Sequence, residues 1–294
     1  MNNAQAVLQF TPPQLTTLAE RAMLVNLTVG KYQPYAYDAA ASKEIDTLHG
    51  TNKAGRFSKR LFAGNMLLKK VSSKFNDVYQ YYVLHTVPWM DNGIRMLPSE
   101  SYFDFTSDMR GLIAKAENSL TELGNAWPQM VQDDMRRLGS LAHAGDYPVS
   151  VVDKFYARVQ FTPVPDSGDF RVNVSQEDKD ALDAAVTNAQ NAVSQYLIGE
   201  MLVPLQAFVS KMNVPIGQEG AVFRDSLVHN IMGLVYRLPR LNINDDPQIT
   251  QAIREIEETV GAYAKNPDKL RNSTAAREDA RAKLDAVLRD LGIN

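Results

Sequence analysis

Near its start the chain carries a run in which apolar and polar residues alternate. Residues 24–29, Leu-Val-Asn-Leu-Thr-Val, show this alternation and are rich in β-branched types, so we predict a strand there. We expect a short helix over about 14–21 before the strand and a helix over about 38–48 after it. Residues 30–37 hold three tyrosines around a proline, which predicts a loop.

A longer amphipathic helix is predicted from Leu61 onward. Its apolar residues recur at spacings of seven, three, four, three and four, at Leu61, Leu68, Val71, Phe75, Val78 and Tyr82. Projected at about 100° per residue, four cations lie within about 60° of one another beside this stripe: Arg56, Lys59, Lys70 and Lys74. They form a ridge only if Gly64-Asn65 does not break the helix.

The rest of the chain has a mainly helical pattern with one clear strand. Residues 154–162 alternate, and we expect them to pair as a hairpin with residues 170–174. Helices are predicted over about 99–124, 127–142, 175–211 with a kink at Pro204, 218–237, 246–264 and 273–291. The expected fold class is α+β, predominantly helical with a small antiparallel sheet.

Length and composition place the chain among globular proteins. It has 294 residues, of which 45% are hydrophobic and 22% charged. We expect a flexible arm at 1–14 and one α-rich domain over 15–294, basic to about residue 98 and acidic and helical beyond it. The start lacks a signal-peptide pattern, and no apolar run approaches the roughly 20 residues of a membrane span, so we expect an intracellular protein without membrane contact.

Residues that usually carry catalysis or bind metals form no recognisable pattern. Cysteine is absent, which excludes disulfides, thiolate metal sites and cysteine nucleophiles. The four histidines stand at no zinc-type spacing, and the acidic pairs at 133–134 and 245–246 are typical of helix caps. No phosphate loop, dinucleotide fingerprint or nucleophile elbow occurs. We therefore expect no enzyme, no metal and no cofactor.

The charge distribution is the most informative feature. Between Asp46 and Asp77 there is no acidic residue, yet there are seven basic ones. Residues 1–75 contain ten Lys/Arg and four Asp/Glu, a net charge of +6, which leaves −9 for the other 219 residues. A charge so divided favours a polyanion at one place and repels it elsewhere, as in nucleic-acid-binding proteins.

Tyrosines lie close to these cations. Unpaired nucleic acid is held by cationic side chains along its backbone and by aromatic rings on which bases stack. The candidate residues for single-stranded DNA are Lys31, Tyr32, Tyr35, Lys43, Lys53, Arg56, Lys59, Arg60, Lys69, Lys70 and Lys74. Two alternatives remain open: Phe57 and Phe62 are more typical of a core than of a stacking surface, and a basic helix face can be plain solvated surface.

The order of several segments resembles a family found in bacterial viruses. The segments are 22–29, 84–97 with its Pro88-Trp89 and Asp91-Asn92-Gly93, 98–105, 161–171 and 223–227. Broadly, they resemble a phage and plasmid domain of uncharacterised function whose genes often lie beside a MoxR-type ATPase. More narrowly, they resemble the single-stranded-DNA-binding RNA polymerase cofactors of podovirus-type phages that carry a giant virion RNA polymerase.

This resemblance implies single-stranded-DNA binding through a fold other than the oligonucleotide-binding barrel. It also implies recruitment of the phage RNA polymerase to melted promoter DNA, self-association into a homo-oligomer and a location in the host bacterial cytoplasm. It assigns no binding residue, so the candidates above rest on charge and aromaticity. Residues 289–294 lack the acidic run by which many single-strand binders contact partners. The alternative is a non-enzymatic adaptor of a MoxR-type AAA ATPase, whose acidic surface the basic segment would meet.

Overall fold

The structure of the protein, a computed structural model, describes residues 17–89, 93–165, 175–219 and 223–292. It is predominantly helical with a small antiparallel sheet, and the residues described form no closed barrel, so the predicted fold class is confirmed. The arm predicted at 1–14 and the hairpin strand predicted at 170–174 lie outside the described residues.

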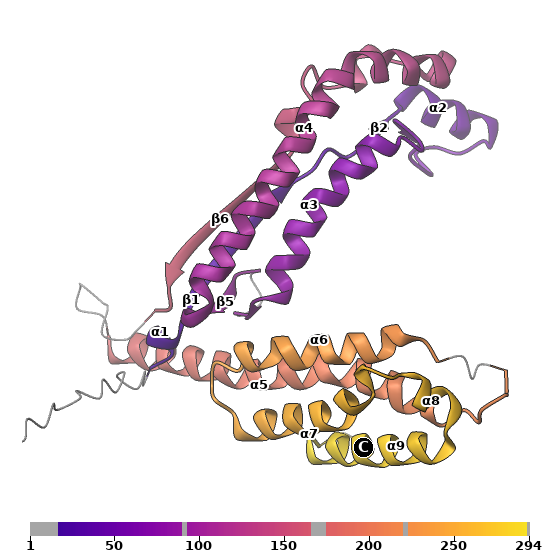
Figure 1. Cartoon of the computed structure of the whole chain (residues 1–294). Coiled ribbons are helices and arrows are strands. Elements are labelled where there is room, and N and C mark those ends of the chain that lie inside the picture. Colours follow the sequence, from indigo (N-terminus) through magenta and orange to yellow (C-terminus); the bar gives the residue numbers. More distant parts are fainter. Residues whose placement is uncertain (1–16, 90–92, 166–174, 220–222, 293–294) are drawn as a thin grey trace, which may run out of the picture. The chain divides into compact units, whose positions relative to one another are not determined.

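Helices make up most of the described chain (Figure 1). They are α1 (Leu18–Arg21), α2 (Ala39–Leu48), α3 (Met66–Leu84), α4 (Tyr102–Leu138), α5 (Gln176–Met212), α6 (Asp225–Leu241), α7 (Pro247–Ala264), α8 (Asp268–Asn272) and α9 (Thr274–Asp290). The strands are β1 (Ala22–Gly30), β2 (Tyr35–Tyr37), β3 (Ser58–Arg60), β4 (Val87–Pro88), β5 (Arg95–Pro98) and β6 (Tyr156–Pro163). One sheet has the order β4-β5-β1-β6, and β2 and β3 form a separate two-stranded ribbon.

Contacts group the chain into two compact units, neither of them continuous in sequence. Unit 1 comprises residues 1–25, 86–102 and 161–294, and unit 2 comprises residues 26–85 and 103–160. Unit 2 contains 15 Lys/Arg and 12 Asp/Glu, a net charge of +3, which leaves −6 for unit 1. The single domain expected over 15–294, basic to about residue 98, stays a prediction. Residues 1–98 contain 11 Lys/Arg and 6 Asp/Glu, a net charge of +5, which leaves −8 for the rest, so the two units show the same charge division less sharply.

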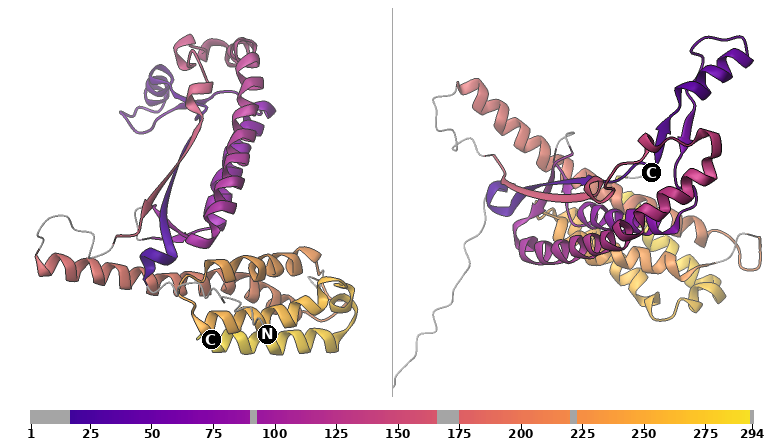
Figure 2. Two further views of the ribbon diagram at one scale, coloured as in Figure 1. Left: turned by 60° about the vertical axis from the view of Figure 1, so that its left-hand side comes forward. Right: turned by 90° about the horizontal axis from the view of Figure 1, so that it is seen from above.

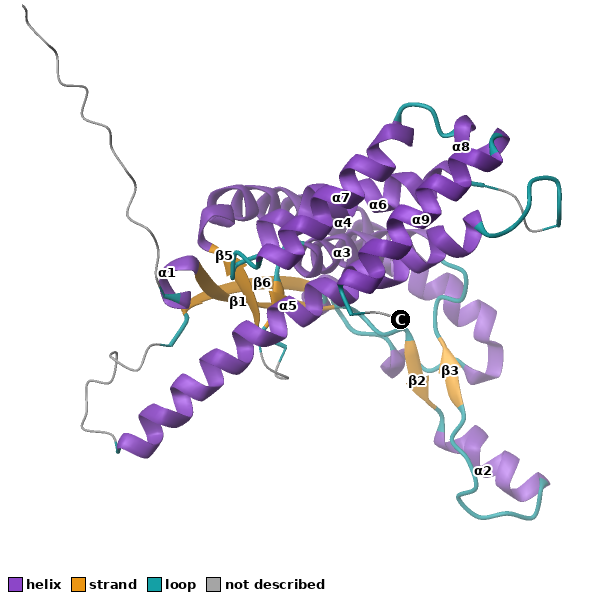
Figure 3. Cartoon of the chain, turned by 90° about the horizontal axis from the view of Figure 1, so that it is seen from below, coloured by secondary structure: helices purple, strands orange, loops and turns teal. Residues whose placement is uncertain are grey.

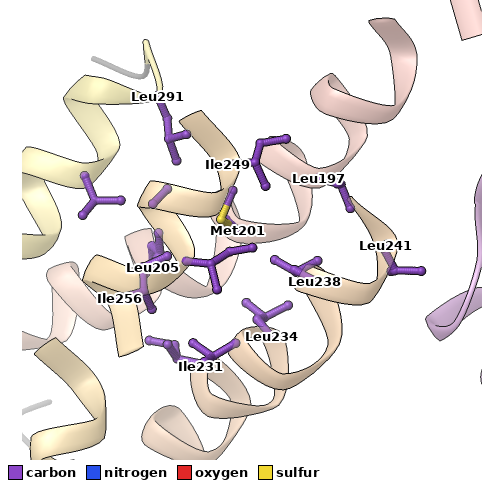
Figure 4. Close-up of a cluster of buried hydrophobic side chains, with 14 of the residues drawn as sticks. Leu197, Met201, Leu205, Ile231, Leu234, Leu238, Leu241, Ile249, Ile256 and Leu291 are labelled. Atoms are coloured by element: carbon purple, nitrogen blue, oxygen red, sulfur yellow. The ribbon is translucent and has the colours of Figure 1, made fainter. Parts of the chain in front are cut away.

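Unit 1 contains a four-helix bundle. Its helices α5, α6, α7 and α9 pack around a ring in the order α5-α6-α7-α9 and back to α5, and α5 also contacts α7 across the ring. Buried residues recur along α5 every three or four positions, at Val193, Leu197, Met201, Leu205 and Phe208. Figure 4 shows several of them packed among side chains of α6 and α7. Burial of this apolar stripe holds the four helices together.

Helix α5 is longer than the bundle needs. Its first turns, over residues 176–188, have no fully buried residue and continue past the other helices (Figure 2). By length and composition alone α5 could cross a membrane, a test that core helices of soluble proteins also meet. Here the apolar part of the helix forms the bundle core.

In unit 2, α3 and α4 pack antiparallel. Lys70 of α3 pairs with Glu122 of α4 at 2.8 Å, whereas Tyr81, further along α3, donates to Asp108, earlier on α4, at 2.9 Å. The stripe predicted on α3 is buried at Leu68, Val71, Phe75, Val78 and Tyr82, as expected. These two helices form the frame that carries the β2–β3 ribbon.

The predicted start of the α3 helix was wrong. The helix begins at Met66, where the Asn65 side chain accepts from the Leu68 amide as N-cap. Before it, Phe62 has φ 50° and Gly64 has φ 79°, left-handed conformations that no helix continues through. Residues 58–60 form β3 instead. The four cations projected onto one helix face therefore form no ridge.

Helix α4 corrects a second expectation, since two helices were predicted and one is found. The chain stays helical through Pro128, a residue that usually costs about 3 kcal/mol inside a helix. Ala116, Leu120, Leu123 and Trp127 are buried at helical spacing on both sides of the expected break. Burial of this continuous stripe outweighs the loss of one backbone hydrogen bond.

Most other predicted elements are found. The strands at 24–29 and 154–162 are β1 and β6, and the helices at 38–48, 175–211, 246–264 and 273–291 are α2, α5, α7 and α9. The helix expected over 218–237 lies further on, at Asp225–Leu241, and only the end of the one expected over 14–21 is described. The loop predicted over 30–37 was wrong in part, because its last three residues are β2.

Candidate nucleic-acid interface

The β2–β3 ribbon has one exposed and one buried face. Its antiparallel register pairs Tyr35 with Arg60, Ala36 with Lys59 and Tyr37 with Ser58. Paired residues share a face and successive residues alternate, so Tyr35, Tyr37 and Arg60 lie on one side and Lys59 on the other. Tyr35 is 57% exposed and Tyr37 47%, whereas Lys59 is only 2% exposed. Figure 3 shows the two strands side by side, with α2 next to them.

A second cation lies over this exposed face. The guanidinium carbon of Arg56 is 4.5 Å from the centroid of the Tyr37 ring, within the range of a cation–π contact. Within the described part of the chain, no carboxylate forms an ion pair with the side chain of Arg56 or Arg60. Two rings and two unneutralised guanidinium groups therefore share one side of a short ribbon.

The basic loop after α2 is fixed by a single carboxylate. Asp46 accepts hydrogen bonds from the Thr51 hydroxyl at 2.9 Å, the Lys53 amide at 2.8 Å and the Ala54 amide at 3.2 Å. The Thr51 hydrogen bond, followed by that of the Lys53 amide, lowers the pKa of Asp46. The loop therefore presents Lys53 in a set conformation, and Lys43 is exposed nearby in sequence on α2.

Lys59, although a candidate by sequence, is built into the interior. Its Nζ donates to the Leu141 carbonyl at 2.9 Å and lies 3.2 Å from Asp38 and 2.6 Å from Asp146. Burial alone would lower the pKa of Lys59, but the charges of Asp146 and Asp38 outweigh it, so the pKa is raised. A phosphate cannot reach this ammonium, and its role is to anchor the underside of the ribbon.

Tyr32 is also structural. Its ring packs edge-on against Phe62 at 6.3 Å and Trp127 at 5.6 Å, in an aromatic cluster that includes Tyr147. Burial, with the nearby charges of Asp134 and Asp146, raises the pKa of Tyr32 to about 12. Phe62, 6% exposed, is a core residue, which agrees with the open alternative for it. Neither ring is free to stack on a base.

The three candidate lysines of α3 differ from one another. Lys70 pairs with Glu122 at 2.8 Å and Lys74 with Asp77 at 3.4 Å, so both charges have local counterions. Lys69 is exposed, and no ion pair joins it to the carboxylates that the structure describes. Exposed ion pairs are weak, about 0–1 kcal/mol, and a polyanion can compete for such lysines. The α3 lysines are thus peripheral to the ribbon face.

Lys31 lies between β1 and β2. Its Nζ donates to the amide oxygen of Asn76 at 2.6 Å, which leaves its charge without an opposing carboxylate in the described structure. Lys31 thus adds a positive charge to the segment that leads into the ribbon.

The structure therefore sorts the candidates into groups. Tyr35, Arg56 and Arg60 come together on the exposed ribbon face, and Lys43 and Lys53 lie on the adjoining helix and loop. Lys59 and Tyr32 point into unit 2, while Lys31, Lys69, Lys70 and Lys74 lie on the segment before the ribbon and on α3.

Sequence reasoning omitted Tyr37 from the candidates and missed the two carboxylates that hold Lys59. Tyr37 could have been included, because Tyr35 and Tyr37 stand two apart and would share one face of any strand. Lys59 and Asp146 lie 87 positions apart in the sequence, so no local pattern predicts their contact. The role of Asp46 could have been predicted in part from the sequence, because an aspartate near a helix end often accepts hydrogen bonds from the turn that follows.

Comparisons with protein-family models, with curated proteins and with solved structures found no match to this chain. Among the residues described, no group of three or more His, Asp or Glu side chains is placed to hold a metal ion. The ribbon face is therefore interpreted from its own chemistry.

Proposed function

We propose that this protein binds single-stranded DNA through the exposed face of the β2–β3 ribbon. The observation that carries the proposal is the coincidence of Tyr35, Tyr37, Arg56 and Arg60 on one face. Guanidinium groups bind phosphates and stack on rings, while exposed tyrosines offer flat surfaces to bases. Protein cores bury such rings; here about half of each is left to solvent.

The ribbon face favours an unpaired strand over a duplex. In a duplex the base faces are stacked on one another, so a tyrosine ring reaches them only after unpairing, which costs a few kcal/mol. The face is also short, with three residues on each strand, whereas a duplex groove is read by a whole helix or a longer ribbon. Binding by charge and stacking is expected to tolerate sequence changes.

The resemblance noted in the sequence extends this proposal to transcription. The narrower resemblance is to the single-stranded-DNA-binding cofactor called Drc. By analogy, this chain would recruit a phage RNA polymerase to melted promoter DNA in the host cytoplasm. Unit 2, with a net charge of +3, would hold the DNA, and unit 1, with −6, is suited to contacts with proteins, including further copies of this chain. We propose a binding protein, not an enzyme.

A double variant of the ribbon cations tests the site. Replacing Arg56 and Arg60 with alanine should weaken binding of a labelled oligothymidylate at least tenfold and flatten its salt dependence by about 0.7 per lost phosphate contact. Fluorescence anisotropy over a salt series measures both.

The matched control is Arg110→Ala. Arg110 is an exposed arginine of the same unit, on α4. It stands 27 positions, roughly 40 Å of helix, from Arg137, whose side chain contacts the ribbon at the Arg60 carbonyl. Arg110→Ala should bind as wild type. The ribbon variant removes two charges and the control one, so if only net charge mattered, Arg110→Ala would lose half as much binding free energy as the ribbon variant. That result would mean that the ribbon is not the site.

One feature favours the alternative, a non-enzymatic adaptor of a MoxR-type ATPase. On α2, Ile45 is 45% and Leu48 78% exposed, and Ser42 is the helix's one buried residue. Ala41, Ile45 and Leu48 recur at helical spacing and form an apolar stripe suited to a protein partner. The adaptor would be favoured if the protein co-purified with such an ATPase, if Leu48→Glu abolished this co-purification, and if the protein bound no oligonucleotide.

A further inference from the structure

Unit 2 contains a second exposed tyrosine–arginine pair, on β6. The guanidinium carbon of Arg158 lies 4.9 Å from the centroid of the Tyr156 ring, and Tyr156 is 39% exposed. This repeats the arrangement of Arg56 over Tyr37, where the same distance is 4.5 Å. Within the described structure, Arg158 has no carboxylate as an ion-pair partner. The strand alternation leaves Tyr156, Arg158 and Gln160 exposed, while Ala157 and Val159 are half-buried.

The position of Tyr156 is fixed by the last residue of β1. Its ring lies directly over Gly30, where any side chain would collide with it. Covering a strand glycine with an aromatic ring is a known way to stabilise a sheet, and it accounts for one face of the ring. It does not account for an exposed guanidinium group held on the same ring.

The chain itself links the two pairs. Gly30, beneath Tyr156, is five residues before Tyr35 on the ribbon, and five residues span at most about 17 Å. The link carries Lys31, whose partner is the neutral amide of Asn76. From β6 to the ribbon, the route thus passes Arg158, Lys31, Arg60 and Arg56, and none of them is neutralised by a carboxylate in the described structure.

We propose that the Tyr156–Arg158 pair is a second contact for the same single strand, which passes from β6 along residues 30–35 to the β2–β3 ribbon. This inference rests on the proposed function and adds the extent of the site. At a stacked rise of about 3.4 Å per nucleotide, 17 Å corresponds to about five nucleotides. A strand of about four nucleotides therefore fills one contact, and one of about twelve spans both.

Two lengths of oligothymidylate, about four and about twelve nucleotides, test the proposal on the full chain. The variant is Tyr156→Leu with Arg158→Gln, in which leucine keeps an apolar cover over Gly30 and the charge is removed. The control is Gln160→Ala, on the same face of β6 two residues further on. Circular dichroism and thermal unfolding verify that each variant is folded.

The expected result is a loss of about tenfold in affinity for the long strand, with affinity for the short strand within about twofold of wild type. The control should match wild type at both lengths. An unchanged affinity for the long strand in the folded variant overturns the second contact but leaves the ribbon site standing. Wild-type protein that binds neither length overturns the proposed function itself. Failure of the second contact alone would leave the effect of the Arg56 and Arg60 changes on binding intact.

Discussion

At the scale of single residues, the ribbon separates two neighbouring cations by function. Lys59 and Arg60 are adjacent and both positive, but alternation along β3 sends one inward and the other outward. Lys59 is held between Asp38 and Asp146, while Arg60 lies exposed opposite Tyr35. A count of positive residues treats the two alike, so the candidates drawn from the sequence contain both. Only the strand register distinguishes them.

Replacing each of these cations with methionine should therefore give opposite results. Lys59→Met leaves the buried Asp38 and the partly buried Asp146 without their counterion, and breaking a buried ion pair in this way costs about 3–5 kcal/mol. We expect Lys59→Met to unfold at a clearly lower temperature than wild type. Arg60→Met should unfold at nearly the wild-type temperature and should instead lose affinity for DNA. Equal unfolding temperatures for the two variants would show that Lys59 does not anchor the ribbon.

At the scale of elements, the hydrophobic periodicity of the sequence predicts most of the helices and strands, but only part of the candidate site. The α3 stripe and the β6 alternation gave correct elements because each is a local pattern with a single period. The β2–β3 ribbon escaped prediction because its strands have three residues each and are stabilised by contacts with distant segments, such as Lys59 with Leu141. Helical periodicity was therefore extended too far back, across Gly64.

The loop after α2 gives a prediction that depends on pH. The pKa of Asp46 is lowered in the folded protein, so the order that its carboxylate imposes is complete above its unfolded pKa of about 3.9. This order is lost as the pH falls through the lower, folded value. Asp46→Asn should reproduce the loss at neutral pH, because an amide nitrogen cannot accept the hydrogen bonds that the second carboxylate oxygen accepts.

Amide hydrogen exchange measures this effect. The amide of Lys53 donates to one oxygen of Asp46 and that of Ala54 to the other, so in Asp46→Asn at least one of these two amides should exchange faster than in wild type. The amides of the α5 core should not change. Exchange at Lys53 and Ala54 that is the same in both proteins would mean that the loop does not depend on Asp46.

At the scale of the whole molecule, the two units divide the charge between them. Unit 2 is net positive and holds both tyrosine–arginine pairs, while unit 1 is net negative and contains the helical bundle. The sequence already showed a charge division, and its boundary near residue 98 stays a prediction. Because each unit is assembled from separate segments, the basic residues 26–85 are joined to the acidic-rich helix α4 and to β6, which no linear reading anticipates.

The central claim is that the exposed ribbon face holds an unpaired strand. The most direct test is the affinity of the wild-type protein for one labelled sequence, single-stranded and as a duplex, between about 50 and 200 mM salt. We predict at least tenfold tighter binding of the single strand, with log affinity falling linearly against log salt at a slope of roughly −2 to −3, as expected for three or four phosphate contacts. Equal affinity for both forms, or no binding of the single strand at the lowest salt, would contradict the account.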